Sequence, residues 1–148
     1  MTMQGILLDT NVLSELMRPQ PSLVVLDWFA AQQRAGTPLM TSSITQAEIL
    51  LGIALLPAGK RRAALADAAA GLFAEDFGPS GCLPFDAAAA ADYAALVAAR
   101  TALGRPVSTE DAQIAAITLS QGLALATRNG RDFGGIDGLA IHDPWAGH

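Results

Sequence analysis

The segment GILLDTN, residues 5–11, decides the fold that we expect for this chain. Its three consecutive apolar residues, 6–8, have the length of a short strand, and a strand without polar alternation is typical of a parallel sheet that is buried on both faces. The strand runs directly into Asp9, Thr10 and Asn11. These polar residues either turn the chain at the edge of the sheet or form the first wall of a functional site.

Further apolar runs of strand length follow at residues 38–42, 81–86, 123–127 and 139–143. Stretches with helical character separate them, at residues 22–34, 45–56, 60–77, 86–103 and 108–121. In the first of these stretches Leu23, Leu26, Phe29 and Ala30 share one side, which we expect to be buried. Because strands alternate with helices, the sequence predicts an α/β fold with a central, mostly parallel sheet of about five strands flanked by helices.

The composition indicates a single globular domain over residues 1–148. Hydrophobic residues make up 51% of the chain and charged residues only 16%, which favours a large core over disorder. No apolar stretch reaches the roughly 18 residues of a membrane span, and Cys82 has no second cysteine with which to form a disulfide. We therefore expect a soluble, cytoplasmic protein.

Acidic residues recur where the predicted strands end or the following helices begin. Asp9 follows the first strand, Glu48 comes shortly after the second, Asp111 opens a helix, and Asp132 follows the fourth strand. Ligands of open α/β sheets bind outside the carboxyl ends of the strands. We therefore expect these carboxyl groups to lie at one edge of the sheet.

Each acidic residue also has a local, structural interpretation. Two pairs have the spacing of a helix capping box, namely Thr45 with Glu48 and Ser108 with Asp111. Asp9 could in the same way cap the helix that follows it. None of these local roles requires the residues to recur at the same edge, so their coincidence favours a shared site.

Three carboxylates brought together raise one another's pKa, because like charges repel. A hard divalent cation relieves this repulsion, and Mg2+ or Mn2+ suits carboxylate and water ligands. Such a site favours a phosphodiester substrate, since a metal ion can activate a water and stabilise the leaving oxygen. The net charge of −5 disfavours broad electrostatic binding to nucleic acid, but a bound metal ion reverses the sign of the field locally.

Four blocks of the sequence resemble the signature motifs of PIN-domain ribonucleases: LLDTNVLSEL at 7–16, ITQAEILLGIALL at 44–56, EDAQIAA at 110–116 and ATRNGRDF at 126–133. More narrowly, they resemble the VapC-type toxins of bacterial toxin–antitoxin pairs, and RPQP at 18–21, LPFD at 83–86 and DPW at 143–145 are similar to the FitB-like branch. The resemblance implies a PIN-like domain and a Mg2+-dependent endoribonuclease toxin, with Mn2+ as a substitute, that cuts a structured RNA such as tRNA.

The resemblance also implies roles for individual residues at the strand ends. Asp9 and Asp111 would bind the metal, and Glu48 would complete the catalytic acidic triad, either as a ligand or through a coordinated water. Thr10 and Asn11 would hold Asp9 in place.

The family's fourth acidic position falls on Asn129, which is neutral in this sequence. Asp132 lies three residues further on and could partly substitute for the missing acid. This departure leaves open whether the site holds one metal ion or two. Arg128 and Arg131 flank the position, and we expect them to contact RNA phosphates.

The partners implied by the resemblance are a cognate VapB- or FitA-like antitoxin and a second copy of the chain in a homodimer. Operator DNA would be bound only through the antitoxin, and no membrane contact is implied. Apolar residues of the stretch 45–56, Ile49, Leu50, Ile53 and Leu56, could serve these contacts or form ordinary core. The basic run at 60–62 is either an RNA contact or a solvated helix start.

Two other functions are compatible with part of the pattern. A phosphatase with an aspartyl nucleophile after the first strand usually carries a second Asp two residues later, where this sequence has Asn11. A non-catalytic binding module is favoured by the missing acid at Asn129 and disfavoured by the retained Asp9, Glu48 and Asp111.

Overall fold

A parallel five-stranded sheet forms the centre of the protein in the computed structural model, which describes residues 4–146. The strands lie in the order β3-β2-β1-β4-β5, and every neighbouring pair runs parallel. Their bounds are β1 Ile6–Leu8, β2 Leu39–Ser42, β3 Cys82–Leu83, β4 Ala124–Ala126 and β5 Ile141–His142. The predicted α/β class and the parallel sheet are thus confirmed, with each strand shorter than its apolar run.

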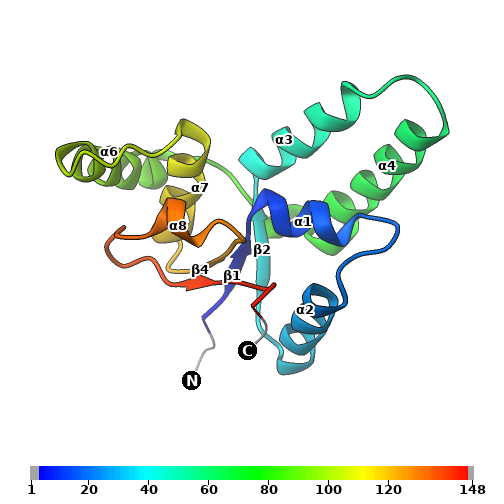
Figure 1. The fold of residues 1–148 in the computed structure, drawn as a ribbon, viewed down its shortest axis with the longest axis horizontal. Helices are drawn as coiled ribbons and strands as arrows, with labels where there is room; N and C mark the ends of the chain where they lie inside the picture. Colours follow the sequence, from blue (N-terminus) through cyan, green and yellow to red (C-terminus); the bar gives the residue numbers. More distant parts are fainter. Residues whose placement is uncertain (1–3, 147–148) are drawn as a thin grey trace.

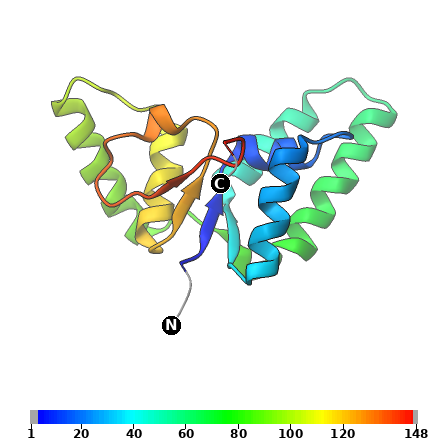
Figure 2. The same ribbon diagram turned by 60° about the horizontal axis from the view of Figure 1, so that its bottom comes forward.

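Helices cover both faces of this sheet (Figure 1). Their bounds are α1 Thr10–Leu16, α2 Leu23–Ala35, α3 Ser43–Ala54, α4 Lys60–Gly71, the π-helical η1 Leu72–Asp76, α5 Gly78–Gly81, α6 Ala87–Ala102, α7 Thr109–Ser120 and α8 Gly130–Phe133. Figure 2 shows α1 to α4 on one side of the strands and α6, α7 and α8 on the other. No helix within residues 4–146 has both the length and the apolar character needed to cross a membrane.

The first strand is buried on both faces, as its unbroken apolar run predicts. Leu7 packs into a core cluster that includes Ile114 and Ile117 of α7. Ile6 and Leu8 point to the opposite face and pack into a second cluster, which contains residues of α1, α2 and α3. Because β1 contributes to both cores, it anchors the two helical layers on a single strand.

The order of the strands reverses beside β1. The chain first adds β2 and β3 on one side of β1, and it then returns to add β4 and β5 on the other side. Leu8 pairs with Ala126 at the carboxyl ends of β1 and β4, so the next residues of the two strands, Asp9 and Thr127, emerge side by side. A reversal of this kind is where open α/β sheets bind their ligands.

The buried side of α2 differs from the prediction. Val25 and Trp28 are its buried residues, whereas Leu23 is 76% exposed and Leu26 37% exposed. Phe29, at the edge of the buried side, is half-buried against the cluster that contains Trp28. The predicted stripe counted only apolar periodicity, and the burial of the bulky Trp28 ring sets the rotation of the helix instead.

Two helix ends also differ from the sequence prediction. Helix α3 begins after Ser42, whose hydroxyl accepts a hydrogen bond from the backbone N–H of Thr45 at 3.1 Å. Thr45 and Glu48 therefore lie inside the helix and form no capping box. The predicted helix 60–77 is α4 followed by the wider turn of η1, in which the N–H of Phe77 bonds to the carbonyl of Leu72.

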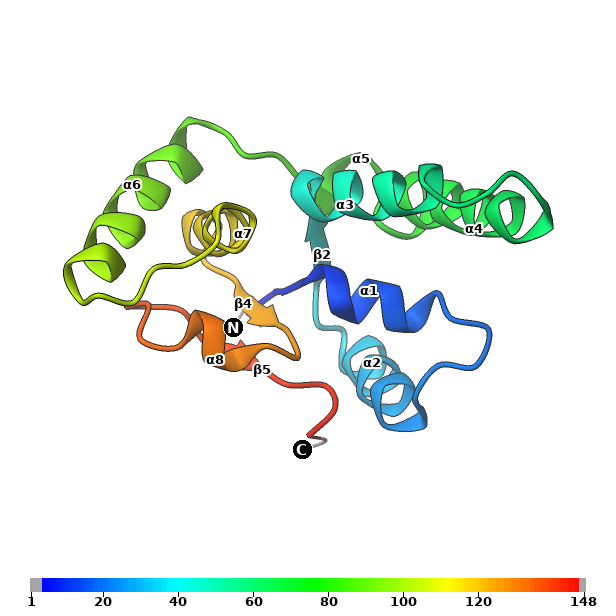
Figure 3. The same cartoon turned by 45° about the horizontal axis from the view of Figure 1, so that its top comes forward.

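Helices α3 and α4 form an arm that extends away from the sheet (Figure 3). They contact each other, and Arg62 in the first turn of α4 donates to the carbonyl of Leu56 just beyond the end of α3, at 3.4 Å. Leu50, Leu51 and Leu55 are exposed on this arm. The arm thus carries apolar surface outside the core, close to the second predicted acidic position.

Candidate active site

Asp9 lies at the reversal point of the sheet and is 4% exposed. It is the N-cap of α1, because its Oδ1 accepts a hydrogen bond from the N–H of Thr10 at 2.8 Å. Its Oδ2 accepts from the hydroxyl of Thr127 at 2.7 Å and from the side-chain amide of Asn11 at 3.5 Å. The predicted capping role of Asp9 is confirmed, and it is combined with burial at the edge where ligands bind.

The pKa of Asp9 is raised above its ordinary value. Burial of the carboxyl group is the largest cause, and the hydrogen bonds from Thr127 and Thr10 only partly offset it. The negative charges of Asp111 and Glu48 raise the pKa further. Two of the acidic groups predicted to converge, Asp111 and Glu48, therefore act electrostatically on the third, the buried Asp9.

Thr10 connects Asp9 to Glu48. Its hydroxyl lies 2.9 Å from Glu48 Oε1 and 3.0 Å from the hydroxyl of Thr45. A hydroxyl has one proton, so Thr10 donates to the carboxylate and accepts from Thr45. Since the backbone N–H of the same residue donates to Asp9, Thr10 fixes one carboxyl group through its main chain and the other through its side chain.

Thr127 is a functional candidate that the sequence prediction did not include. It follows β4, is fully buried, and makes the shortest of the hydrogen bonds to Asp9. Its oxygen also accepts from the backbone N–H of Asn129 at 3.1 Å and from the amide of Asn11 at 3.4 Å. Its position directly after a buried strand, like that of Asp9, is the signal in the sequence that could have identified it.

Asp111 stands in the first turn of α7 and is half-buried. The hydroxyl of Ser108 accepts from its backbone N–H at 3.2 Å, which confirms the predicted cap at this helix start. Burial raises the pKa of Asp111, the Ser108 hydrogen bond lowers it, and the charges of Asp132 and Glu110 raise it again. Asp132 is therefore electrostatically coupled to Asp111.

The segment after β4 carries the remaining candidates at the surface. Asn129 and Asp132 are exposed, and the N–H of Asp132 donates to the carbonyl of Asn129 at 2.9 Å in the short helix α8. The side chain of Asn129 makes no capping hydrogen bond to α8. Arg131 is exposed in the same turn. The side chain of Asn129 is thus less firmly held than that of Asp9, which accepts three hydrogen bonds.

Arg128 is held by two different contacts. Its backbone N–H donates to the side-chain oxygen of Asn11 at 3.3 Å. Its guanidinium lies 4.8 Å from the centre of the Trp145 ring, in a cation–π contact with the C-terminal DPW motif. Arg128 thus stands beside the acidic site with its charge placed over an aromatic face.

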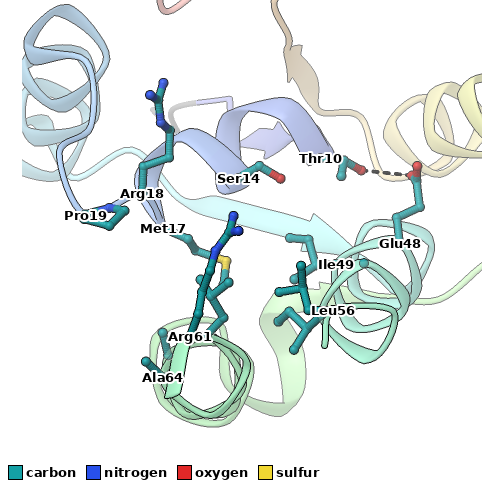
Figure 4. Close-up of a pocket in the computed structure, with 14 residues that line it drawn as sticks. Thr10, Ser14, Met17, Arg18, Pro19, Glu48, Ile49, Leu56, Arg61 and Ala64 are labelled. Atoms are coloured by element: carbon teal, nitrogen blue, oxygen red, sulfur yellow. Dashed lines mark hydrogen bonds between the residues drawn. The ribbon is translucent and has the colours of Figure 1, made fainter. Parts of the chain in front are cut away.

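A groove of about 620 Å³ begins at the acidic site and runs between α1, α3 and α4 (Figure 4). Thr10 and Glu48 line one part of it, and Arg18 and Arg61 lie away from them. The remaining lining residues are mostly apolar and include Ile49, Ile53, Leu56, Leu65 and Ala68. The groove therefore combines an acidic part, an apolar floor and a basic part.

The side chains around Asp9 fit a hard divalent cation by their chemistry. Their donors are carboxylate, amide and hydroxyl oxygens, and these suit Mg2+ or Mn2+. Within residues 4–146, no three acidic, histidine or cysteine side chains stand close enough together to hold an ion as they are placed. The charges of Glu48 and Asp111 nevertheless reach Asp9 and raise its pKa.

The sequence is similar to known proteins over nearly its whole length. The PIN domain family model matches residues 6–139. Plasmid stability protein StbB of Pseudomonas syringae pv. tomato is 44% identical, and the match covers 95% of this chain and 98% of that protein. VapC ribonuclease Y4jK of Sinorhizobium fredii is 39% identical, with 95% and 97% covered, and toxin FitB of Neisseria gonorrhoeae is 38% identical, with 95% and 98% covered.

Solved structures agree with these sequence matches. FitAB bound to an IR36 DNA fragment matches with a TM-score of 0.83 at 34% identity and 95% coverage of both chains. FitAcB from Neisseria gonorrhoeae matches with a TM-score of 0.81 at 35% identity, with 95% of this chain and 98% of that chain covered. These matches cover the strands whose order reverses at Asp9 and the acidic residues around it. The chain belongs to the PIN-domain family, within its branch of VapC- and FitB-type toxins.

Proposed function

We propose that this protein is a Mg2+-dependent endoribonuclease, the toxin of a toxin–antitoxin pair, which hydrolyses phosphodiester bonds of a structured RNA such as tRNA. The observation that carries the proposal is the buried carboxyl group of Asp9. Its pKa is raised, and Glu48 and Asp111 add negative charge to the space around it. Ribonuclease activity in the name of a relative that is 39% identical supports the choice of substrate class.

In this proposal Asp9 and Asp111 hold the metal, and Glu48 either holds it or orients a bound water. The metal, when bound, lowers the pKa of a water and stabilises the charge that develops on the phosphate. Thr10 and Thr127 keep the carboxyl group of Asp9 in one orientation through hydrogen bonds of 2.8 and 2.7 Å. Fixed ligand orientation of this kind supports metal affinity.

Asn129 and Asp132 determine how many ions the site takes. Asn129 is neutral, so the family's fourth acid is absent at that position. The charge of Asp132 acts on Asp111. Asp132 is therefore the acid that could take the place of the missing fourth acid. We therefore propose one firmly held ion, with Asp132 as an outer ligand.

Arg128 and Arg131 are proposed to recruit the RNA backbone. The chain has a net charge of −5, so attraction to phosphates must be local. Arg128 is placed beside the acidic site by Asn11 and Trp145, and Arg131 is exposed one turn of α8 away. Phosphate contacts of this kind position the substrate without reading its sequence.

The experiment that tests the proposal is cleavage of a tRNA pool by purified, antitoxin-free protein. Mg2+ or Mn2+ should support cleavage, and EDTA and the variant Asp9→Asn should abolish it. Glu15→Gln is the matched control, because Glu15 is also a buried acid of α1 but lies at the other end of the helix. Cleavage that survives both EDTA and Asp9→Asn would contradict the proposal.

Two further outcomes distinguish the remaining functions. Folded protein that binds Mn2+ but cuts no RNA would favour a binding module that has kept the fold without the chemistry. Hydrolysis of p-nitrophenyl phosphate in place of RNA would favour a phosphatase. Both outcomes are measured on the same preparation and with the same Asp9→Asn control.

The antitoxin is proposed to occupy the groove between α1, α3 and α4. The solved relatives include FitAB and FitAcB complexes, which supports a partner of this class. A basic side chain of the antitoxin would meet Glu48 and Asp9, apolar residues would cover Ile53 and Leu56, and acidic residues would pair with Arg18 and Arg61. Replacing Ile53 with Glu should weaken binding of a co-expressed antitoxin in a pull-down, whereas the same replacement at exposed Leu103 should not.

A homodimer is proposed through the other side of the arm. Leu50, Leu51 and Leu55 are exposed there, away from the groove-lining Ile49 and Ile53. Sedimentation of the wild type and of Leu51→Glu would report the change from dimer to monomer. Binding to operator DNA is proposed to require the antitoxin, and the cytoplasm is the proposed location.

A further inference from the structure

Arg100 is a buried arginine behind the acidic site. It lies in the last turn of α6 and is 5% exposed. Its Nε donates to the carbonyl of Arg105 at 2.7 Å, and its Nη1 donates to the carbonyls of Gly134 at 3.0 Å and Asp132 at 3.3 Å. The guanidinium therefore joins the loop after α6 to the end of α8 and the residue that follows it.

The charge of Arg100 is compensated in an unusual way. In the part of the chain that the structure describes, no carboxylate lies within ion-pair distance of its guanidinium, and its partners are backbone carbonyls. Burying a charge is costly unless it is well hydrogen-bonded. A neutral side chain would fill the same space at lower cost, but only arginine presents several donors in a rigid planar fork. The contacts, rather than the packing, account for an arginine at this position.

The two joined segments lead to the two acids on this side of the site. Arg105 begins the segment that passes through Ser108 to Asp111 at the start of α7. Asp132 lies in α8, and Gly134 directly follows this helix. A Cβ added at Gly135 would meet Nη1 of Arg105 at 3.2 Å, so a second arginine lies against the same segment.

The carboxylates of Asp111 and Asp132 repel each other, and the charge of Asp132 raises the pKa of Asp111. Repulsion alone favours a larger separation of the two carboxyl groups. One hydrogen bond of Arg100 goes to the carbonyl of Asp132 itself, and another goes to the carbonyl of Gly134 two residues further on. They therefore oppose this separation directly.

We propose that Arg100 is a positioning residue: it fastens the segment of Asp132 to the segment that precedes Asp111, so that both carboxyl groups face one metal site. The proposal rests on the proposed function, since it assigns Arg100 a role in the metal binding of that site. Arg100 itself touches neither metal nor substrate.

The test is Mn2+ binding to the full chain without RNA, measured by electron paramagnetic resonance of the free ion. Arg100→Met should weaken Mn2+ binding about tenfold, the lower end of the effect of supporting residues around metal sites. Arg100→Lys should weaken it less, because an ammonium can bond to one loop but lacks the fork that joins both. Arg34→Met is the matched control, since Arg34 lies in the last turn of α2 and is exposed.

The decisive comparison is made in the background of Asp132→Asn. If Arg100 acts by placing Asp132, Arg100→Lys should cause no further loss of Mn2+ affinity there. Equal losses in both backgrounds would overturn the proposal, as would unchanged Mn2+ affinity in Arg100→Lys. Should Arg100→Met fail to fold, Arg100→Lys still supplies both comparisons.

Failure of the proposed function has a different signature. A wild type that binds Mn2+ but cuts no RNA would refute the nuclease and leave the role of Arg100 measurable. A wild type that binds no Mn2+ would overturn both proposals. Hydrogen exchange of the amides from residue 132 to 136 adds a second measure, because these amides should exchange faster in Arg100→Lys than in the wild type.

Discussion

Helix α1 carries a buried acid at each end, and the two differ in their chemistry. Asp9 at the start is 4% exposed and Glu15 near the end is 7% exposed, yet burial is the largest influence on the pKa of Asp9 and only the second largest on the pKa of Glu15. The pKa of Asp9 is raised, whereas that of Glu15 is lowered. The direction of each pKa shift therefore depends on whether the neighbours of the carboxyl group outweigh the effect of its burial.

The neighbours of Glu15 stabilise its charged form. The backbone N–H of Ser22 donates to its carboxylate at 2.9 Å and is the main reason for the lowered pKa. Arg18 forms an ion pair with it at 3.3 Å, and the charge of Arg128 adds to the effect. Glu15 thus ties the loop between α1 and α2 to the helix.

The neighbours of Asp9 leave its charge uncompensated. Among the described residues its hydrogen-bond donors, Thr10, Thr127 and Asn11, are all neutral, and nearby carboxylates add repulsion. A buried carboxyl group without a compensating charge, at the point where the strand order reverses, favours the binding of a cation there. The comparison separates a structural acid from a functional candidate on one helix.

The largest expected effect concerns stabilisation by metal. At a Mg2+ concentration of about 100 times Kd, the wild type should gain about 2.7 kcal/mol in its free energy of unfolding. Glu15→Gln should keep this gain and Asp9→Asn should lose it, because only Asp9 is proposed to bind the ion. Denaturant unfolding with Mg2+ and with EDTA measures the gain. An equal gain in Asp9→Asn would remove the distinction between the two acids.

Without metal, Asp9→Asn should be at least as stable as the wild type. The raised pKa means that ionising Asp9 costs more in the folded chain than in the unfolded chain, so its contribution to stability decreases as the pH rises through the acidic range. The amide removes this cost. A large loss of stability in EDTA would show that Asp9 is chiefly a structural cap.

The second effect concerns Thr127, whose hydroxyl donates to Asp9 at 2.7 Å. Thr127→Val should lower the free energy of unfolding by about 1–3 kcal/mol, since it leaves a buried carboxylate oxygen without this donor. It should also weaken metal binding roughly 10- to 100-fold. Thr118→Val is the control, because Thr118 is equally buried and donates at 2.7 Å to the carbonyl of Ile114 within α7. Its Mn2+ affinity should stay unchanged.

The third effect is the pH dependence of the contribution that Glu15 makes to the free energy of unfolding. Because its folded-state pKa lies below the ordinary value of 4.5, Glu15 contributes stability above that value, and the contribution is lost as the pH falls through the folded-state pKa. Glu15→Gln should therefore be less stable than the wild type at pH 7, and the difference should vanish in the acidic range. Unfolding curves over this range measure it. A difference independent of pH would indicate a packing effect.

The smallest expected effect concerns Asn129, which is exposed. Asn129→Asp should change the free energy of unfolding by less than about 0.5 kcal/mol, as is usual for surface positions. Mn2+ binding should tighten, since the added acid stands beside Thr127 and near Asp132. Asn129→Ala is the neutral control, and tightening in both variants would rule out the added charge as the cause.

The fold was largely predictable because its decisive signals are local. The apolar run at Ile6–Leu8 required burial on both sides, and alternation with helical stretches required parallel strands. Short-range signals also located Asp9 as a helix cap and Ser108 as the cap before Asp111. The catalytic roles assigned to Asp9, Glu48 and Asp111 stay predictions until the cleavage experiment is done.

The errors arose where a predicted local pattern competed with a different contact. Leu23 and Leu26 were predicted to be buried, but the burial of Trp28 rotates α2 and exposes them. Thr45 was predicted to cap α3, but Ser42 at the end of β2 reaches its N–H and starts the helix earlier. The first error was overruled by tertiary packing, and the second by another local contact, between residues only three positions apart.

The sequence by itself thus determined the parallel sheet and the acids at its carboxyl edge. The spacing of apolar residues and the residues that begin or end each element are properties of short segments. Only the tertiary structure decided that Thr127 meets Asp9 and that Arg100 joins the segments of Arg105 and Asp132. The physical reason is that these partners are far apart in the chain. Their distances are fixed by strand register and helix packing, which no short segment encodes.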